Sequence, residues 1–329
     1  MFEAIGQDTV MHETAVHWIV FLVFVVAMLM LDLGVFHKKD KEVSVKEAIL
    51  WTVFWIVLAL LFCFGIYLFG HKTQAFDFFT AYLLEKSLSV DNLFVFIMIF
   101  GYFNIAPRYQ HKILFWGILG ALVMRAIFIF AGVALISRFG WVMYLFGAFL
   151  VYSGIHMLFQ KDKDEDFNPE KNLVIRGFRK LMPVTDRNPE GHFFVRRDGV
   201  LYATTFFLTL LFIEVSDLIF AVDSVPAVLS VSNDTFIVFT SNIFAILGLR
   251  SLYFALSGIM GYFQYLKYAL AGILSFIGVK MCVNELMKEL GNEPPISNYA
   301  SLGVIVGLLT VAIVASVIVK KRGAKRAQA

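Results

Sequence analysis

Long apolar runs recur along nearly the whole chain, and this feature limits the possible fold more than any other. Of the 329 residues, 59% are hydrophobic and only 16% are charged. A helix that crosses a bilayer needs about 20 mostly apolar residues, and its backbone polar groups must be hydrogen-bonded within the segment. The runs therefore predict an all-α, polytopic transmembrane helical bundle, a single membrane domain over residues 1–329 with membrane lipid around it.

The apolar runs divide into about nine predicted spans. The residues before the first span include Glu3, Asp8 and Glu13, and no Lys or Arg precedes Lys38. A cleavable signal peptide would begin with a basic region, so we expect the first span to be retained. The predicted spans cover residues 16–36, 48–69, 76–103, 111–136, 140–160, 199–226, 235–256, 264–288 and 299–319.

The distribution of Lys and Arg predicts the orientation of these spans. If the N-terminus lies outside, the inside segments hold twenty Lys and Arg, and the outside segments hold only Lys72, Arg138 and Lys288. Basic residues concentrate on the cytoplasmic side of membrane proteins. We therefore expect the N-terminus outside and the C-terminus in the cytoplasm. Because topology explains the basic residues, they do not indicate a nucleic-acid partner.

Two segments outside the predicted core are rich in charge. Residues 161–198 form a loop with many Asp, Lys, Arg and Pro, and residues 299–329 combine the last span with a basic tail. The loop has the composition of a solvated cytoplasmic linker, or of a regulatory or docking surface. It contains no Walker A sequence and has no room for a catalytic domain.

An internal repeat relates residues 76–160 to residues 199–290. The segment EKSLSVDN, from Glu85, matches DLIFAVDS, from Asp217, and Arg125 matches Arg250. The segment YLFGAFLVYSGIHM, from Tyr144, matches YALAGILSFIGVKM, from Tyr268. Each unit holds three spans, so the second unit is inverted relative to the first. We therefore predict a 3 + 3 inverted-repeat core, an arrangement that places substrate sites at the bilayer midplane in many transporters.

The main candidates for function are five carboxylates of the two acidic motifs, in the third and sixth predicted spans: Glu85, Asp91, Glu214, Asp217 and Asp223. Burying each one costs about 2.5–3.5 kcal/mol at the centre of a membrane helix, so a cation, a buried Arg or a proton must compensate. Each acidic motif ends in an amide or hydroxyl residue, and Pro226 follows the second motif. We expect the helices to be distorted or broken there. The predicted metal ligands are Glu85, Asp91, Asn92, Glu214, Asp217, Asp223 and Ser224.

Oxygen ligands of this kind favour hard or borderline divalent cations such as Mn²⁺, Mg²⁺ and Ca²⁺. Neither Cys63 nor Cys282 accompanies the acids, and no His lies among them, so no resident cofactor is predicted. Other interpretations remain open for several charges. Glu85 and Lys86 could form a structural ion pair. Arg125 and Arg250 could be counter-ions of the acids or substrate ligands.

Two further residues or motifs allow a structural or a functional interpretation. Asp32, near the inner end of the first span, could be interfacial or could line a path through the protein. Gly303 and Gly307 have the spacing of a helix-packing motif.

The acidic motifs EKSLSVDNLFVF (85–96) and FIEVSDLIFAVDSVPA (212–227) resemble those of the TerC family of integral membrane proteins. Similarity continues in NIFAILGLRSLYF (242–254) and LKYALAGILSFIGVKM (266–281) and covers about residues 48–290. With its central loop, the chain resembles the long, nine-span branch of the family. The resemblance implies a multi-pass protein of the bacterial inner membrane that exports metal ions, with Mn²⁺ as the transported ion.

The sequence therefore predicts a secondary transporter that exports a divalent cation by alternating access, with Asp91 and Asp223 as core ligands and with proton antiport as a plausible coupling. One alternative is a membrane interaction protein that assists the insertion or metal loading of exported proteins, with secretion machinery as its partner. A tellurite-resistance factor is another, although carboxylates would repel an oxyanion. A metal-dependent membrane enzyme is not expected, because the spans offer no convincing nucleophile or His base.

Overall fold

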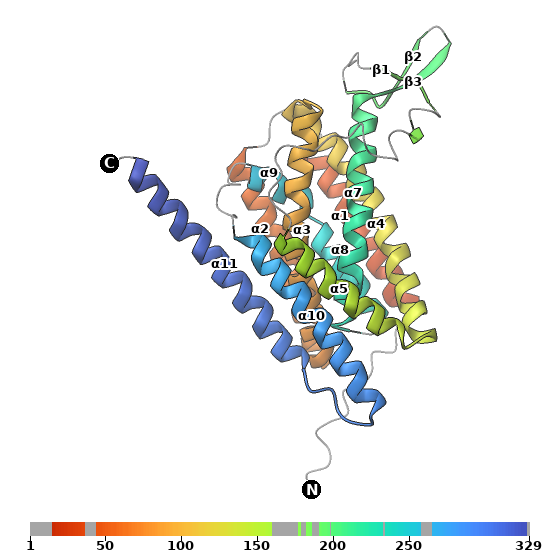
Figure 1. The fold of residues 1–329 in the computed structure, drawn as a ribbon. Coiled ribbons are helices and arrows are strands. Elements are labelled where there is room, and N and C mark those ends of the chain that lie inside the picture. The colour runs from red at the N-terminus through yellow and green to blue at the C-terminus, as the bar shows by residue number, and fades with distance from the viewer. Residues whose placement is uncertain are drawn as a thin grey trace.

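The computed structural model describes residues 15–36, 44–159, 177–178, 182–185, 191–197, 199–232, 234–257 and 265–327, without the side chains of 33–36, 91 and 320–327. The chain folds into a bundle of long helices, and a small sheet lies beyond one end of the bundle (Figure 1). The predicted polytopic helical fold is therefore confirmed.

The helices follow the predicted spans closely. The first half contains α1 (Ala15–Phe36), α2 (Val45–Leu68), α3 (Lys72–Tyr102), α4 (Pro107–Arg138) and α5 (Val142–Phe159). The second half contains α7 (Thr205–Leu229), α8 (Thr235–Ile246), α9 (Leu249–Ser257), α10 (Leu266–Glu289) and α11 (Asn298–Ala327). Local capping explains several helix starts. Ser44 accepts a hydrogen bond from the Glu47 amide at the start of α2, and Pro107 occupies the first turn of α4.

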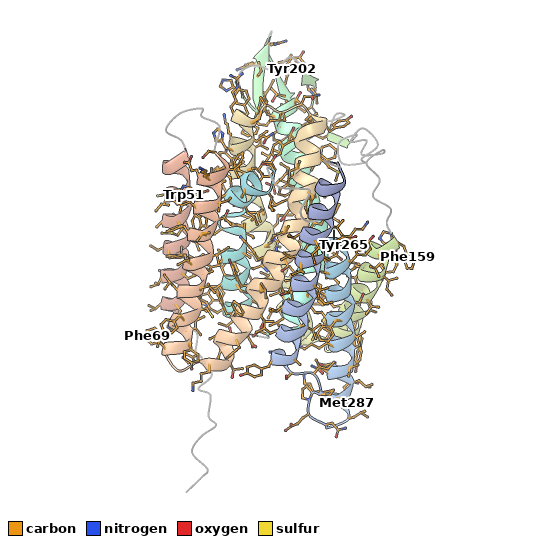
Figure 2. All side chains as sticks on the ribbon, turned by 90° about the vertical axis from the view of Figure 1, so that its left-hand side faces the viewer. Trp51, Phe69, Phe159, Tyr202, Tyr265 and Met287 are labelled. Atoms are coloured by element: carbon orange, nitrogen blue, oxygen red, sulfur yellow. The ribbon has the colours of Figure 1, made fainter. Side chains whose placement is uncertain are left out.

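The small sheet marks one end of the bundle, which we call the sheet end. Its strands are β1 (Val184–Thr185), β2 (Phe194–Arg197) and β3 (Val200–Thr204), in the order β1-β3-β2, with β1 parallel and β2 antiparallel to β3. Tyr202 lies at this end, and Phe69 and Met287 lie at the opposite one, the far end (Figure 2). The predicted start of a span at residue 199 is wrong, because residues 200–204 are a strand and the helix begins at Thr205.

A break divides one predicted span into two short helices. Helix α8 begins at Thr235, and its N-cap Asp234 accepts side-chain hydrogen bonds from the Phe236 and Ile237 amides. It ends at Ile246, and α9 continues at an angle of 40°. Gly248 in the break has φ +81°, and a Cβ on it would lie 2.5 Å from the Trp55 ring of α2. The break thus depends on a glycine packed against a tryptophan.

Length and hydropathy qualify most of these helices as membrane spans. Among the described residues, seven helices pass both criteria, and α8 with α9 would make an eighth if the bent pair is one span. Helix α3 has 31 residues but carries Lys72, Asp77, Glu85, Lys86 and Asp91, too many charges for an apolar span. The count of nine spans therefore stays a prediction.

Large apolar side chains cover the outside of the bundle (Figure 2). Leu50 of α2 is 70% exposed and Val311 of α11 is 68% exposed, and both lie on the long outer helices. Water would disfavour so much exposed apolar surface, whereas lipid tails solvate it. The outer surface therefore has the character expected of a protein that faces lipid.

Helices α5 and α10 pack closely through small residues. A Cβ on Gly147 would lie 2.8 Å from the Gly278 carbonyl oxygen, and a Cβ on Gly154 would lie 2.6 Å from the Ala271 carbonyl oxygen. The predicted repeat aligns Gly147 with Ala271 and Gly154 with Gly278. Replacing each residue of the Gly147–Gly278 contact by its repeat equivalent therefore gives the Gly154–Ala271 contact. A two-fold axis between the units would produce this pattern. The inverted repeat itself stays a prediction.

Gly303 and Gly307 do not support the predicted packing motif in α11. Among the residues that the structure describes, a Cβ on either residue would meet no atom within 4 Å. No helix of the described part of the chain therefore approaches α11 closely at these two glycines.

Candidate functional site

A buried arginine lies at the centre of a charged cluster inside the bundle. Arg125 of α4 is 1% exposed and its guanidinium forms an ion pair with Glu85 of α3, which is fully buried. It also donates to the Asn242 Oδ1 of α8 at 2.9 Å. The motif acid Glu85 therefore has a buried cation as its partner. Such a partner offsets the free-energy cost of placing a charged carboxylate inside the membrane.

Helix α7 contributes two further oxygen groups to the same arginine. The Asp217 Oδ1 lies 3.4 Å from Arg125 Nη2, and the Ser224 Oγ lies 3.4 Å from Nη1. Asp217 and Ser224 are seven residues apart, two turns of helix, and so project from one face. Four helices, two from each predicted repeat unit, thus meet at one buried point.

The cluster holds more carboxylate than its arginine neutralises. With Glu85, Asp217 and Arg125 ionised, one negative charge remains. Asp217 Oδ2 is buried and has no hydrogen-bond partner among the described residues, although Asn242 Nδ2 donates to the second oxygen of Glu85 at 3.3 Å. Leaving a buried carboxylate oxygen without a partner is costly. The cluster can therefore accept another cation or a proton.

Glu214 lies beside this cluster, three residues before Asp217 on α7. Its carboxylate occupies the space next to Gly120 of α4, where any Cβ would overlap it. The lack of a side chain at Gly120 therefore makes room for the acid. Glu214 is half-buried and lies on the same side of α7 as Asp217.

The second acidic motif does not direct all its acids to one point. Asp223 accepts a hydrogen bond of 2.8 Å from Ser153 Oγ of α5, so it faces α5 and not Arg125. Its neighbour Ser224 faces the cluster, because adjacent residues of a helix point about 100° apart. The Asp91 side chain lies outside the described residues, so the role of Asp91 and Asp223 as core ligands stays a prediction.

In the second half of the first acidic motif, the structure describes the side chain of Asn92 but not that of Asp91. Asn92 is 5% exposed, so its side chain lies inside the bundle. Ser89, one turn beyond Glu85, is 1% exposed, and its hydroxyl has no partner among the described residues. Both side chains therefore present oxygen atoms within the protein interior.

The expected distortion of the motif helices is wrong. Helix α3 runs without interruption through Asp91 and Asn92, and α7 continues through Pro226 to Leu229. Pro226 lies in the last turn of α7, where the lost hydrogen bond affects few residues. The broken segment is instead α8–α9, which brings Asn242 into the cluster.

Lys86 does not form a structural ion pair with Glu85, which was one interpretation of the sequence. Its ammonium donates to the Ala245 carbonyl oxygen of α8 at 3.1 Å, while Glu85 pairs with Arg125. Ala245 lies in the last turn of α8, where carbonyl groups lack helical partners and carry partial negative charge. Lys86 therefore stabilises the broken end of α8.

Among the residues whose side chains are described, the acid that pairs with Arg250 is Asp32, which lies outside the two acidic motifs. Arg250 forms an ion pair of 2.8 Å with the Asp32 carboxylate of α1 and donates to the Asp32 carbonyl oxygen at 2.6 Å. Asp32 is 7% exposed, so its carboxylate is buried in the protein, and its placement at the depth of the membrane interface stays a prediction. Because the chain bends at Gly248, α9 runs in a different direction from α8. Arg250 of α9 contacts α1. The predicted equivalence of Arg125 and Arg250 therefore does not extend to their partners.

Sequence analysis missed Asn242 and Ser153 as partners of the acids. Both are polar residues within apolar stretches of predicted spans. A polar residue in such a stretch indicates a buried hydrogen-bond partner, and this was the sequence signal that could have found them. Among the residues whose side chains are described, no group of three or more His, Cys, Asp and Glu could hold a metal ion. The cluster combines carboxylates with a guanidinium, an amide and a hydroxyl, so the protein's own cation occupies part of it.

The fold and the cluster define an integral membrane protein of several helical passes with a charged centre. The sequence profile described as the integral membrane protein TerC family matches residues 70–324, and the chain belongs to this family. The resemblance found in the acidic motifs is therefore confirmed.

Relatives match the chain over almost its whole length. An uncharacterized membrane protein, STKORF319, of Myxococcus xanthus is 48% identical over 92% of each chain. A protein of Salmonella typhi named putative membrane-bound redox modulator Alx is 44% identical over 96% of this chain and 98% of its own. The protein of that name from Escherichia coli K12 is 42% identical over 95% of this chain and 98% of its own. No solved structure matches the chain.

Proposed function

We propose that this protein is a secondary transporter that exports a divalent metal cation, Mn²⁺ in the first place, across the bacterial inner membrane. The buried cluster of Glu85, Asp217 and Arg125 carries the proposal, because its carboxylates come from both predicted repeat units. Transporters built from inverted repeats bind substrate at such an interface. The N-terminus lies outside and the C-terminus in the cytoplasm in this proposal.

The donor atoms agree with a hard or borderline cation. Glu85, Asp217 and Ser224 offer oxygen only, and Glu214 lies one turn from Asp217. Carboxylate and hydroxyl oxygens suit Mn²⁺ and Mg²⁺ better than Cu⁺, which prefers sulfur. Asp91, Asn92 and Asp223 stay proposed ligands of another state of the same protein, since alternating access rearranges the two units.

Arg125 makes the empty state tolerable. When no metal is bound, the guanidinium neutralises the acids that a divalent cation would otherwise hold. Arrival of a divalent cation brings twice the charge of the arginine to the same carboxylates, so Coulomb attraction favours exchange of partners. After export, Arg125 returns to Glu85 and Asp217, and a proton on Glu214 can supply the remaining positive charge.

The test measures metal content and flux together. We expect cells that contain the protein to hold less Mn²⁺ than cells without it, with Mg, Ca, Zn and Fe measured in the same samples. In proteoliposomes, Asp217→Asn should abolish Mn²⁺ flux because it removes a buried carboxylate of the cluster.

The matched control is Glu285→Gln, which removes an acid of α10 that lies 3.8 Å from Lys288 at the far end. That variant should transport normally. If no metal level changes with the protein present, and no metal crosses the reconstituted membrane, the export function is wrong.

An interaction role is a second candidate, and the sheet supports it. Strand β3 begins with Val200 and Leu201, which are 46% and 50% exposed, beyond the end of the bundle. Such a surface could contact machinery that inserts exported proteins or loads them with metal. The double substitution Val200→Ser and Leu201→Ser should abolish that role and leave Mn²⁺ flux unchanged, whereas Asp217→Asn should do the reverse.

A further inference from the structure

A second polar network joins several helices toward the far end of the bundle. Lys280 of α10 is 3% exposed, and its ammonium donates to Asn298 Oδ1 at 2.7 Å. Asn298, the first residue of α11, donates to Asp77 Oδ1 of α3 at 2.6 Å and to the Val231 carbonyl oxygen at 2.8 Å. One amide thus connects a buried cation with a buried acid.

The network crosses the boundary between the two predicted repeat units. Asp77 belongs to the first unit, whereas Val231 and Lys280 belong to the second. Val231 follows the end of α7 and lies a few residues before Asp234, which caps α8. A movement of the units against each other at this end must therefore break hydrogen bonds of Asn298.

The network lies on the same row of α3 side chains as the charged cluster. Asp77, Ala81, Glu85 and Ser89 follow each other at intervals of four residues, and all four are buried. Residues at this spacing are neighbours along a helix surface. At a rise of about 1.5 Å per residue, Asp77 lies about 12 Å from Glu85 along the helix. A row with an acid, a small residue, an acid and a hydroxyl therefore leads from the cluster to the far end.

The opposite end of the boundary is hollow. A cavity of about 620 Å³ lies at the sheet end between α3, α4 and α9. Ile97 and Gly101 of α3 line it together with Gln110 of α4 and Tyr253 of α9. The two predicted units are thus tied by the polar network toward one end. Toward the other end they line a cavity and are joined there by a hydrogen bond of 3.0 Å from the Tyr253 hydroxyl to Gln110 Oε1.

We propose that Asp77, Asn298 and Lys280 form the far-end gate of the transport path, and that the structure represents the state in which this gate is closed. The gate rests on the proposed transport function, because a gate serves only a protein that moves a substrate. Closure keeps the ammonium and the carboxylate satisfied through Asn298. Opening frees Asp77, whose carboxylate then meets a cation that moves along the α3 row.

A cysteine introduced into the α3 row reports whether the gate is open. Ala81 is fully buried between Asp77 and Glu85, so the thiol of Ala81→Cys should react slowly with a membrane-impermeant reagent. The background replaces Cys63 and Cys282 with Ala, which leaves the introduced cysteine as the single thiol. Right-side-out and inside-out vesicles separate access from the two faces.

Loss of the gate contacts should expose the introduced cysteine to one face only. We expect Lys280→Met, and separately Asn298→Ala, to raise its labelling rate about tenfold from the far-end face, as a shift toward the open population requires. The matched control is Lys288→Met, which removes the same charge from the same helix at a side chain that is 70% exposed. That control should leave the labelling rate unchanged.

The outcomes separate the gate from the transported ion. If both gate variants remain folded, as gel filtration shows, and label no faster than the control, the gate proposal is wrong. If one variant does not fold, the other decides. If labelling rises but no metal crosses the membrane in the unmodified protein, the gate stands and the proposed cation is wrong. If Mn²⁺ flux is present while labelling does not respond, the proposed cation stands and the gate is wrong.

Discussion

At the scale of single residues, the charged cluster is a balance of large opposing free energies. Arg125 and Glu85 are almost completely buried, so both have lost their hydration. Desolvation of an ion pair can cost as much as the attraction returns, but removal of one partner leaves a buried charge without compensation. Ser224 Oγ and Asn242 Oδ1 accept hydrogen bonds from Arg125, and Asn242 Nδ2 donates one to Glu85, and these bonds supply part of the difference. The cluster is therefore sensitive to loss of any single charge.

The first prediction concerns Arg125. Arg125→Met should destabilise the protein by about 3–5 kcal/mol, because it leaves Glu85 and Asp217 buried without their cation. Thermal unfolding in detergent measures the loss. Adding Glu85→Gln to Arg125→Met should recover part of the stability, since one orphaned carboxylate is then neutral. Equal melting temperatures for Arg125→Met and the unmodified protein would contradict the proposed balance.

At the scale of elements, the break between α8 and α9 positions two buried polar groups. Asn242 lies before the break and binds Glu85 and Arg125, whereas Arg250 lies after it and binds Asp32. The bend of 40° separates the two directions. Aromatic contacts hold α8 in place, including Phe244 with Phe62 of α2 at 4.9 Å between ring centroids. The broken helix therefore links the charged centre to the first two helices.

The second prediction concerns the glycine in this break. Gly248 and Gly291 both have positive φ, +81° and +77°, but only a Cβ on Gly248 would meet the Trp55 ring. Gly291→Ala should cost about 1–2 kcal/mol for the backbone conformation alone. Gly248→Ala should cost clearly more, and the excess should shrink in a Trp55→Ala background. Thermal unfolding of the four variants checks this, and equal losses for the two Ala variants would exclude the packing explanation.

At the scale of the whole molecule, orientation in the membrane follows from charge. Among the described residues, Arg196 and Arg197 lie in the sheet, and Lys112 donates to the Gly191 carbonyl oxygen next to it at 2.9 Å. The count over the full sequence puts twenty Lys and Arg in the predicted inside segments and three in the predicted outside segments. The positive-inside rule therefore predicts that the sheet lies in the cytoplasm, as in the proposed orientation. In that orientation the proposed far-end gate would face outward, and the cavity at the sheet end would face the cytoplasm, from which the proposed exporter would collect its substrate.

The third prediction tests this orientation. A fluorescent protein fused after Ala329 should fluoresce, because it folds in the cytoplasm, and alkaline phosphatase at the same position should be inactive. Alkaline phosphatase fused after Gly70, at the turn between α2 and α3, should be active. The opposite pattern of activities would reverse the orientation, and with it the proposed direction of the gate.

The boundaries of most helices could be read from the sequence, because a bilayer demands apolar runs of nearly fixed length. Span 48–69, for example, differs from α2 (Val45–Leu68) by three residues at one end and one at the other. The strand at Val200–Thr204 was missed because its apolar residues continue directly into α7. The site was predictable as a set of acids with Arg125 as a possible counter-ion, because the cost of burying Glu85 and Asp217 requires a partner. Which acids Arg125 would contact did not follow from the sequence.

By itself, the sequence determined that the protein is a helical membrane protein, that acids such as Glu85 and Asp217 lie inside its spans, and which family it belongs to. Tertiary structure alone decided the partners. Arg125 and Arg250 occupy matching positions in the repeat, yet one neutralises Glu85 and the other Asp32. Asp223 and Ser224 are adjacent, yet they face different helices. The physical reason is that hydropathy is a property of each segment, whereas pairing depends on how the helices rotate and bend when they pack, and Gly248 sets one such bend.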